Sequence, residues 1–378
     1  MDARRRTDAE YRAVQDPKSA PNKKDKKKIK ITHHHGRTIL VEIPGFDLGR
    51  HVVVDIMHLY YNIVKGLMLK FIGPYGHLPK DDREFVAKKL DKLERPEEFA
   101  RKPQRFFILS SWKATELRQF LLYTGPVILK GYLPVAEYEN FLSLCVAIRL
   151  LNDDRFYEDD SELPEFVKKL IRYFLSSSAD LYGVEFVTLA VHMILHLPDD
   201  CLEFGKPETF SCFPHEDKNY KLGLSVASGK KPWEQVRNRY EEAIFSKIYA
   251  EPPHWTKRGS GTVLLRPCKL QKGNLIFSSN KEGDRYCSVK RSSPSRWPIF
   301  VQIHSFSQEE NDIIVTGKKF KFISIYFISP CSSEEVDIYE CGTLSSSLIS
   351  FKAEEIEKKY YAIPLDHEKM VLIGLLHV

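Results

Sequence analysis

The chain has 378 residues with 57 basic and 51 acidic side chains, so its formal net charge is +6. Hydrophobic residues at 43% and aromatic residues at 12% exclude a globally disordered chain, and the length favours two or three domains. Seven scattered cysteines without a Cys-x-x-Cys pair argue against a disulfide framework, and no apolar run reaches the roughly 18–20 residues of a membrane helix.

Residues 1–37 are predicted to be a disordered basic tail. They hold twelve basic and five acidic side chains, a net charge of +7, which leaves −1 for the other 341 residues. A uniformly basic nucleic-acid-binding body is therefore excluded. The central lysine run is either a solubilising segment or a patch for nuclear import and DNA contact. It consists of Lys23, Lys24, Lys26, Lys27 and Lys28.

Order is predicted to begin in the segment 38–77. Three β-branched residues before Asp55 predict a short buried strand, and apolar residues at three- and four-residue steps predict an amphipathic helix over 56–72. Gly73-Pro74 is expected to end that helix. Asp55 is either a metal ligand fixed by the strand or the N-cap of the helix, and His58 lies on roughly the same helical face.

Residues 78–200 are predicted to be entirely helical. Apolar stripes and proline or glycine stops mark short helices, which we expect to pack as a compact bundle. One of them is expected to end at Gly125-Pro126, and the last, 184–197, at Pro198. The i,i+4 pair His192 and His196 has a spacing suited to zinc, but histidines bordering a core explain it equally.

In the C-terminal part, the sequence pattern changes from one typical of helices to one typical of β-strands. Residues 201–260 are expected to be irregular apart from one helix over 233–249. From residue 261 to 378, short apolar segments alternate with turn residues, which predicts an antiparallel β domain. Glu216, in the sequence Phe-Pro-His-Glu, is either a solvated first-turn acid or a candidate site residue.

Several sequence blocks, in order, resemble the animal members of the CACTA/Mirage/Chapaev group of cut-and-paste DNA transposases. The resemblance runs from about residue 33 to 240 and continues more loosely through the β-rich region. The longest block, Trp112–Lys130, reads Trp-Lys-Ala-Thr-Glu-Leu-Arg-Gln-Phe-Leu-Leu-Tyr-Thr-Gly-Pro-Val-Ile-Leu-Lys. The other blocks are His34–Gly36, Val54–Leu59, Pro96–Pro103, His192–Asp200 with Phe204-Gly205, and Ser211–Glu216.

The resemblance implies an α+β fold. It consists of an incomplete RNase H-like core with an all-helical insertion, followed by a β-rich C-terminal domain. Residues 38–77 would be a remnant of that core, 78–200 the insertion, 201–260 the core return and linker, and 261–378 the β domain. In this class three carboxylates hold two Mg²⁺ ions that act on a DNA phosphodiester. Asp55 would be the second carboxylate and Glu216 the third.

The sequence departs from the family where the first carboxylate should lie. Upstream of Asp55 there is a lysine-rich tail instead of an apolar strand ending in Asp, and Asp47 is too close to Asp55 to replace it. The amino-terminal DNA-binding region expected of such transposases is also missing, which indicates a truncated, transposase-derived protein. Because catalytic carboxylates act as a unit, we predict that this chain does not cleave DNA, and Mg²⁺ is implied by resemblance only.

Two alternatives remain open at this point. The chain is either a domesticated DNA- or chromatin-binding protein or a protein-interaction module that uses its β domain. Nuclear residence is expected from the family resemblance and the lysine run, and the chain could form a homo-oligomer. DNA would be bound by the tail and by further basic residues of the insertion. These are Arg101, Lys102, Arg105, Lys113 and Arg118.

Overall fold

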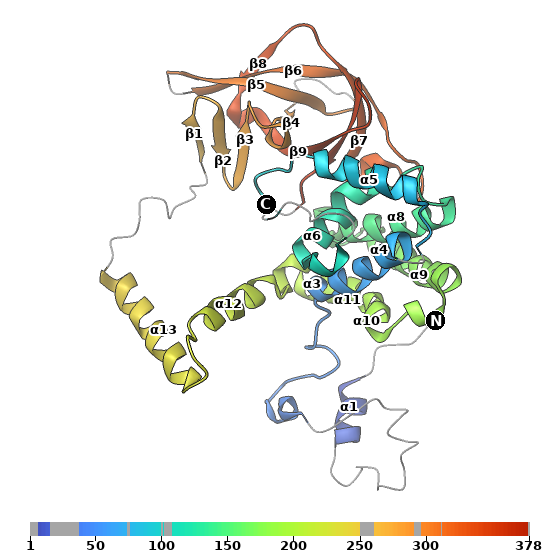
Figure 1. Cartoon of the computed structure of the whole chain (residues 1–378), viewed down its shortest axis with the longest axis vertical. Coiled ribbons are helices and arrows are strands. Elements are labelled where there is room, and N and C mark those ends of the chain that lie inside the picture. Colours follow the sequence, from blue (N-terminus) through green and yellow to red (C-terminus); the bar gives the residue numbers. More distant parts are fainter. Residues whose placement is uncertain are drawn as a thin grey trace.

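The computed structural model of the chain describes residues 7–15, 38–73, 76–99, 101, 108–249, 261–290, 296–310 and 312–376. In this part of the chain, helices come first and strands follow from residue 262, as Figure 1 shows. The predicted α+β class and β-rich C-terminal part are confirmed. None of the described helices is both long enough and apolar enough to cross a bilayer.

Part of the predicted disordered tail is helical. Helix α1 (Asp8–Gln15) lies against the segment after residue 38. Arg12 donates to the carbonyls of Val41 and Phe46 at 2.9 and 2.6 Å, and Asp8 accepts from the Leu48 N–H at 2.9 Å. These contacts satisfy polar groups of both segments, which explains order where composition predicted none. The other residues of the tail lie outside the described part.

The helix predicted over 56–72 is confirmed, but the prediction of a strand before it is wrong. Three segments run as one helix ending at Gly73: α3 (Ile56–Leu59), a π-helical stretch (Tyr60–Val64) and α4 (Lys65–Ile72). Residue 52 is a bend and residues 53–55 form no regular structure, and in the described chain they pair with no strand. The buried carboxylate of Asp200 accepts the Val54 N–H at 2.8 Å, so a side chain takes the place of a sheet neighbour.

The helical body contains the other predicted helices, but the helix predicted over 184–197 is broken, with only one α-helix, Leu189–His192, lying within it. The segments Met193–His196 and Pro207–Phe210 between its helices are 3₁₀-helical. The full helices are α5 (Lys80–Lys92), α6 (Ala114–Gln119), α7 (Gly125–Ile128), α8 (Val135–Leu150), α9 (Leu163–Tyr182), α10 (Leu189–His192) and α11 (Leu197–Phe204).

Two predicted helix ends at prolines are wrong. The chain runs helically from α6 through a π-helical stretch (Phe120–Thr124) into α7, past Pro126. A proline in a helix leaves the carbonyl four residues before it without its donor. Here the Leu122 carbonyl accepts from the Arg149 guanidinium at 3.0 Å instead. Pro198, expected to end a helix, lies in the first turn of α11, where a proline loses no hydrogen bond.

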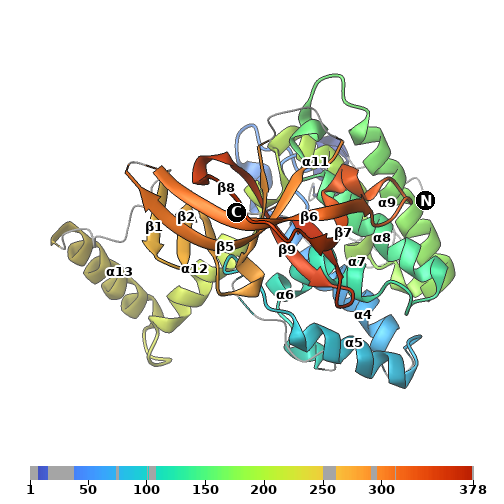
Figure 2. The same ribbon diagram turned by 90° about the horizontal axis from the view of Figure 1, so that it is seen from above.

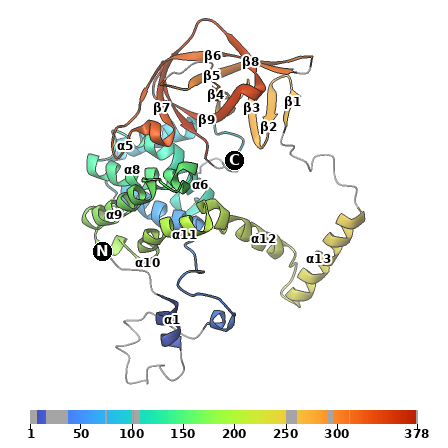
Figure 3. The same cartoon turned by 180° about the vertical axis from the view of Figure 1, so that it is seen from behind.

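Beyond the body, α12 (Phe213–Leu224) and α13 (Pro232–Tyr249) lead away from it, as Figures 1 and 3 show. α13 was predicted, whereas α12 lies in a segment predicted to be irregular. Its apolar residues form no clear stripe, and none of its residues is buried.

The C-terminal part is an antiparallel β domain. A small sheet contains β1 (Thr262–Arg266), β2 (Lys269–Lys272) and β3 (Leu275–Ser278). The larger sheet has the order β5-β4-β9-β10-β7-β6-β8, and pairing of β5 with β6 closes it into a barrel (Figure 2). Its strands are β4 (Tyr286–Val289), β5 (Ile299–Glu309), β6 (Asp312–Ile325), β7 (Ile338–Leu344), β8 (Ile349–Lys352), β9 (Ile356–Pro364) and β10 (Lys369–Gly374).

The barrel and the helical body share one hydrophobic core, to which β-domain residues such as Tyr361 and Ile373 belong. A segment after α5, residues 93–99, binds the barrel and is called the strap. Its Glu98 pairs with the fully buried Lys359 at 2.7 Å, and Lys359 also contacts the fully buried Asp284 at 2.5 Å. Phe99 packs against the Tyr361 ring, with the centroids 5.5 Å apart. The strap therefore joins body and barrel through apolar and ionic contacts together.

Candidate functional site

Asp55 lies where two helices begin. Its carboxylate accepts from the backbone N–H groups of Met57 and His58, in the first turn of α3, at 3.3 and 3.1 Å. It also accepts the Cys212 N–H, immediately before α12, at 2.8 Å. The His58 ring nitrogen Nδ1 contacts the same carboxylate. Asp55 is thus the N-cap of α3 and, at the same time, the anchor of α12.

The electrostatics of this position favour a negative charge. Partial burial alone would raise the pKa of Asp55, but the hydrogen bonds from Cys212, His58 and Met57 outweigh it and hold the pKa below its usual value. Both helix N-termini add positive partial charge at the carboxylate. Burial and the nearby Asp55 charge raise the pKa of the Cys212 thiol, so this cysteine stays a neutral thiol at pH 7.

Glu216 lies one helical turn beyond Cys212. It is exposed on α12, and its N–H donates to the Cys212 carbonyl at 2.9 Å. Its charge is also among the causes that raise the Cys212 pKa. The fold therefore brings the neighbourhoods of the two predicted acids together across about 160 residues of sequence. Asp55 is engaged in capping, while Glu216 points its charge toward solvent.

The blocks that carried the family resemblance meet around Asp55. Asp200, from the His192–Asp200 block, holds the Val54 N–H just before Asp55. Arg118, from the Trp112–Lys130 block, pairs with Glu208 at 2.8 Å and lies over the Phe213 ring at 4.6 Å. Asp200 and Cys212 were not predicted as site residues. Both residues lie in blocks that resemble the transposase family, and that resemblance is the sequence signal that could have identified them.

The residues around Asp55 fit Mg²⁺ poorly. Mg²⁺ prefers octahedral oxygen ligands, whereas the group that the described chain brings together is Asp55, His58 and Cys212, with ligand atoms within 4.8 Å of one another. That mixed set is closer to zinc chemistry. A cation there would face two helix N-termini and compete with four hydrogen-bond donors for the carboxylate. The geometry favours a cap over a metal centre.

The other predicted site residues do not form a second centre. The rings of His192 and His196 lie 6.0 Å apart at an 82° angle, and no further ligand joins them in the described residues. Arg101 and Lys113 are exposed, whereas Arg118 is committed to Glu208. The remaining basic candidates, Lys23, Lys24, Lys26, Lys27, Lys28, Lys102 and Arg105, lie outside the described residues.

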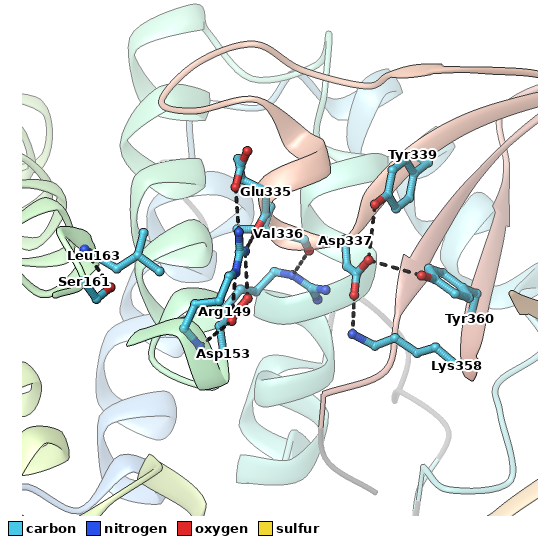
Figure 4. Close-up of polar contacts among 11 residues, drawn as sticks. Arg149, Asp153, Ser161, Leu163, Glu335, Val336, Asp337, Tyr339, Lys358 and Tyr360 are labelled. Carbon is cyan, nitrogen blue, oxygen red and sulfur yellow. Dashed lines mark hydrogen bonds and ion pairs between the residues drawn. The ribbon is translucent and has the colours of Figure 1, made fainter. Parts of the chain in front are cut away.

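A polar cleft of about 290 Å³ lies between body and barrel. Arg149, fully buried on α8, donates to the Val336 carbonyl at 2.8 Å (Figure 4). It also donates to the Gly374 carbonyl at 3.0 Å. Across the cleft, Asp337 accepts from the Tyr360 hydroxyl at 3.1 Å and pairs with Lys358. Asp337 is paired with Lys358 and Asp154 with Lys206, and Arg149 binds backbone carbonyls, so the cleft is a polar seam between body and barrel.

The comparisons with known proteins bear on the barrel alone. A family model described as a domain of unknown function (DUF8592) matches residues 260–375, the stretch that carries β1 to β10. The search of curated proteins and the search of solved structures returned no match.

Proposed function

We propose that this chain is a transposase-derived protein in which Asp55 has a structural role and does not support DNA strand transfer. The observation that carries the proposal is the convergence of the family-like blocks. Segments around Val54, Arg118, Asp200 and Cys212 are far apart in sequence yet contact one another directly. Common descent accounts for both the sequence resemblance and this mutual packing. The incomplete RNase H-like core remains part of the proposal.

The absence of strand transfer follows from how Asp55 is used. A two-metal mechanism needs carboxylate oxygens free to bridge ions. The Asp55 oxygens instead accept from Cys212, His58 and Met57. Glu216, the proposed third carboxylate, is exposed on α12 and not hydrogen-bonded toward Asp55 in the described contacts.

The test is a nicking assay on supercoiled DNA with the full chain and either Mg²⁺ or Mn²⁺. We expect the wild-type protein, Asp55→Ala and Glu216→Gln to give the same background. Nicking by the wild type that Asp55→Ala abolishes would overturn the proposal. The Asp47→Asn variant, which changes a nearby acid outside the candidate pair, is the control for contaminating nuclease.

DNA binding without cleavage is a second candidate, favoured by the exposure of Arg101 and Lys113 on the body. Each neutralised phosphate contributes about −0.9 to the slope of log K against log salt. Replacing both residues with Ala should therefore flatten the slope by about 1.8. Deleting residues 1–37 measures the contribution of the basic tail separately. Unchanged slopes in both variants would exclude these residues as the DNA contacts and leave the nicking result unaffected.

A further inference from the structure

Helices α12 and α13 form an arm that projects from the body in all three overall views (Figures 1, 2 and 3). The turn between the two helices is held by Gln235. Its side chain accepts the Ala227 N–H at 2.8 Å and donates to the Ser228 and Lys230 carbonyls at 3.0 and 2.6 Å. Several hydrogen bonds from one side chain thus hold the turn against the start of α13.

α13 presents an apolar stripe to solvent. Trp233, Tyr240 and Ile244 are 84, 60 and 41% exposed. Together with the half-buried Val236 they follow steps of three, four and four residues, which places them on one face of the helix. An isolated helix of this length is marginally stable in water, and most of its stability must come from packing of such a face. We therefore expect the stripe to pack against a partner surface.

The charges of α13 identify that partner. Arg237 and Glu241 lie on the same flank of the stripe, because residues follow one another at about 100° around the helix. Within the chain this pair is loose, at 3.9 Å. If a second α13 packs antiparallel about a two-fold axis, Arg237 of each copy faces Glu241 of the other. In a parallel pair this flank of one helix meets the opposite flank of the other, so Arg237 and Glu241 of the two copies would not meet.

We propose that α13 is the contact of a two-fold symmetric dimer, in which the stripe of one copy packs antiparallel on the stripe of a second copy. This inference does not depend on the transposase origin of the chain. A helix of 18 residues is about 27 Å long, so the contact is smaller than a standard interface of about 1,600 Å². We therefore expect a concentration-dependent dimer with a dissociation constant in the micromolar range.

The experiment is sedimentation equilibrium of the full chain over a wide concentration range. Trp233→Ala should weaken the dimer at least about tenfold, because large aromatic anchors dominate such contacts. Phe245→Ala is the matched control. Phe245 is 61% exposed on the same helix but points away from the stripe, so its loss should leave the dimer unchanged. Far-UV circular dichroism checks that each variant retains its helices.

Charge reversal separates contacts between copies from contacts within one helix. Arg237→Glu and Glu241→Arg each break the pair inside α13, and each should weaken the homodimer. Mixing the two variants restores opposite charges only across the dimer, so a heterodimer at least as stable as the wild type is expected. A chain that stays monomeric at all concentrations, equal effects of Trp233→Ala and Phe245→Ala, or a mixture that fails to associate would each overturn the proposal.

Discussion

The buried contact between strap and barrel allows a sharp test of how the two parts of the molecule are joined. Lys359 has no exposed side-chain surface and contacts Glu98 and Asp284, whose side chains are 7 and 0% exposed. It also donates to the Ile276 carbonyl. The variant Lys359→Met keeps the length of the side chain and its apolar stem but removes the ammonium group. Two carboxylates are then left without their main positive partner.

The expected loss follows from the environment of those carboxylates. Removing one partner of a buried ion pair costs about 3–5 kcal/mol, because the other charge remains buried. Backbone donors still serve both acids: the Ile276 N–H reaches Glu98 at 2.8 Å, and the Glu97 N–H reaches Asp284 at 2.8 Å. Lys281 also contacts Asp284 at 2.8 Å. We therefore expect a loss near the lower end, about 3 kcal/mol.

Urea unfolding followed by circular dichroism measures this loss. The control is Lys269→Met, which removes a half-buried lysine that pairs with the exposed Glu97 on the same strap at 2.8 Å and should lose less than about 1 kcal/mol. The triple variant Lys359→Met, Glu98→Gln, Asp284→Asn removes all three charges and should recover part of the loss. If Lys359→Met loses no more than Lys269→Met, or if the triple variant is the least stable, the reasoning about buried charge is refuted.

Three further predictions concern contacts elsewhere in the molecule. Gly283→Ala should destabilise the protein by about 1–3 kcal/mol in urea unfolding, because the added Cβ would lie 2.3 Å from the Arg95 carbonyl oxygen. Gly223→Ala, whose Cβ would meet nothing within 4 Å, is the control and should not destabilise the protein. Arg149→Lys should lose about 2–3 kcal/mol in the same measurement, because one ammonium cannot reach three carbonyls held by a planar fork. Asp55→Asn should remove a pH-dependent part of the stability. Because the fold lowers the pKa of the Asp55 carboxyl, the ionised group stabilises the fold above its ordinary pKa of 3.8, and this stabilisation is lost as the pH falls through the lowered pKa. The difference in unfolding free energy between wild type and variant should therefore shrink on acidification.

Local patterns predicted those helices whose apolar residues recur at helical spacing between clear end signals. The helix over 56–72, α8 and α13 begin and end close to the positions that stripe spacing and proline or glycine signals indicated. The predictions failed where a distant side chain replaces a backbone partner. Arg149 lets the chain stay helical past Pro126, and Asp200 holds the Val54 N–H, which a neighbouring strand would otherwise bind. Neither contact has a signature in the local sequence.

The candidate site shows the same division. The local sequence left Asp55 open as either a helix cap or a metal ligand, and the structure shows that it caps α3. Its second set of contacts, with Cys212, spans 157 residues and could not be inferred from spacing. Residues 96–99 of the strap belong to the family-like block Pro96–Pro103, but the contact of the strap with the barrel was not predicted. Its partner Lys359 lies 261 residues from Glu98, and a lysine in a strand is ordinarily expected to face solvent.

The sign of a stability change distinguishes an inherited catalytic acid from a structural one. Acids kept for catalysis are commonly held at some expense of stability, so their neutral replacements leave the fold as stable or more stable. A cap behaves in the opposite way, because replacement by Ala leaves helix N–H groups without an acceptor and loses about 1–2 kcal/mol. Asn is itself a good cap, so Asp55→Asn at neutral pH should fall between wild type and Asp55→Ala. Since Asp55 also anchors α12 through Cys212, that ranking reports on the arm as well as on α3.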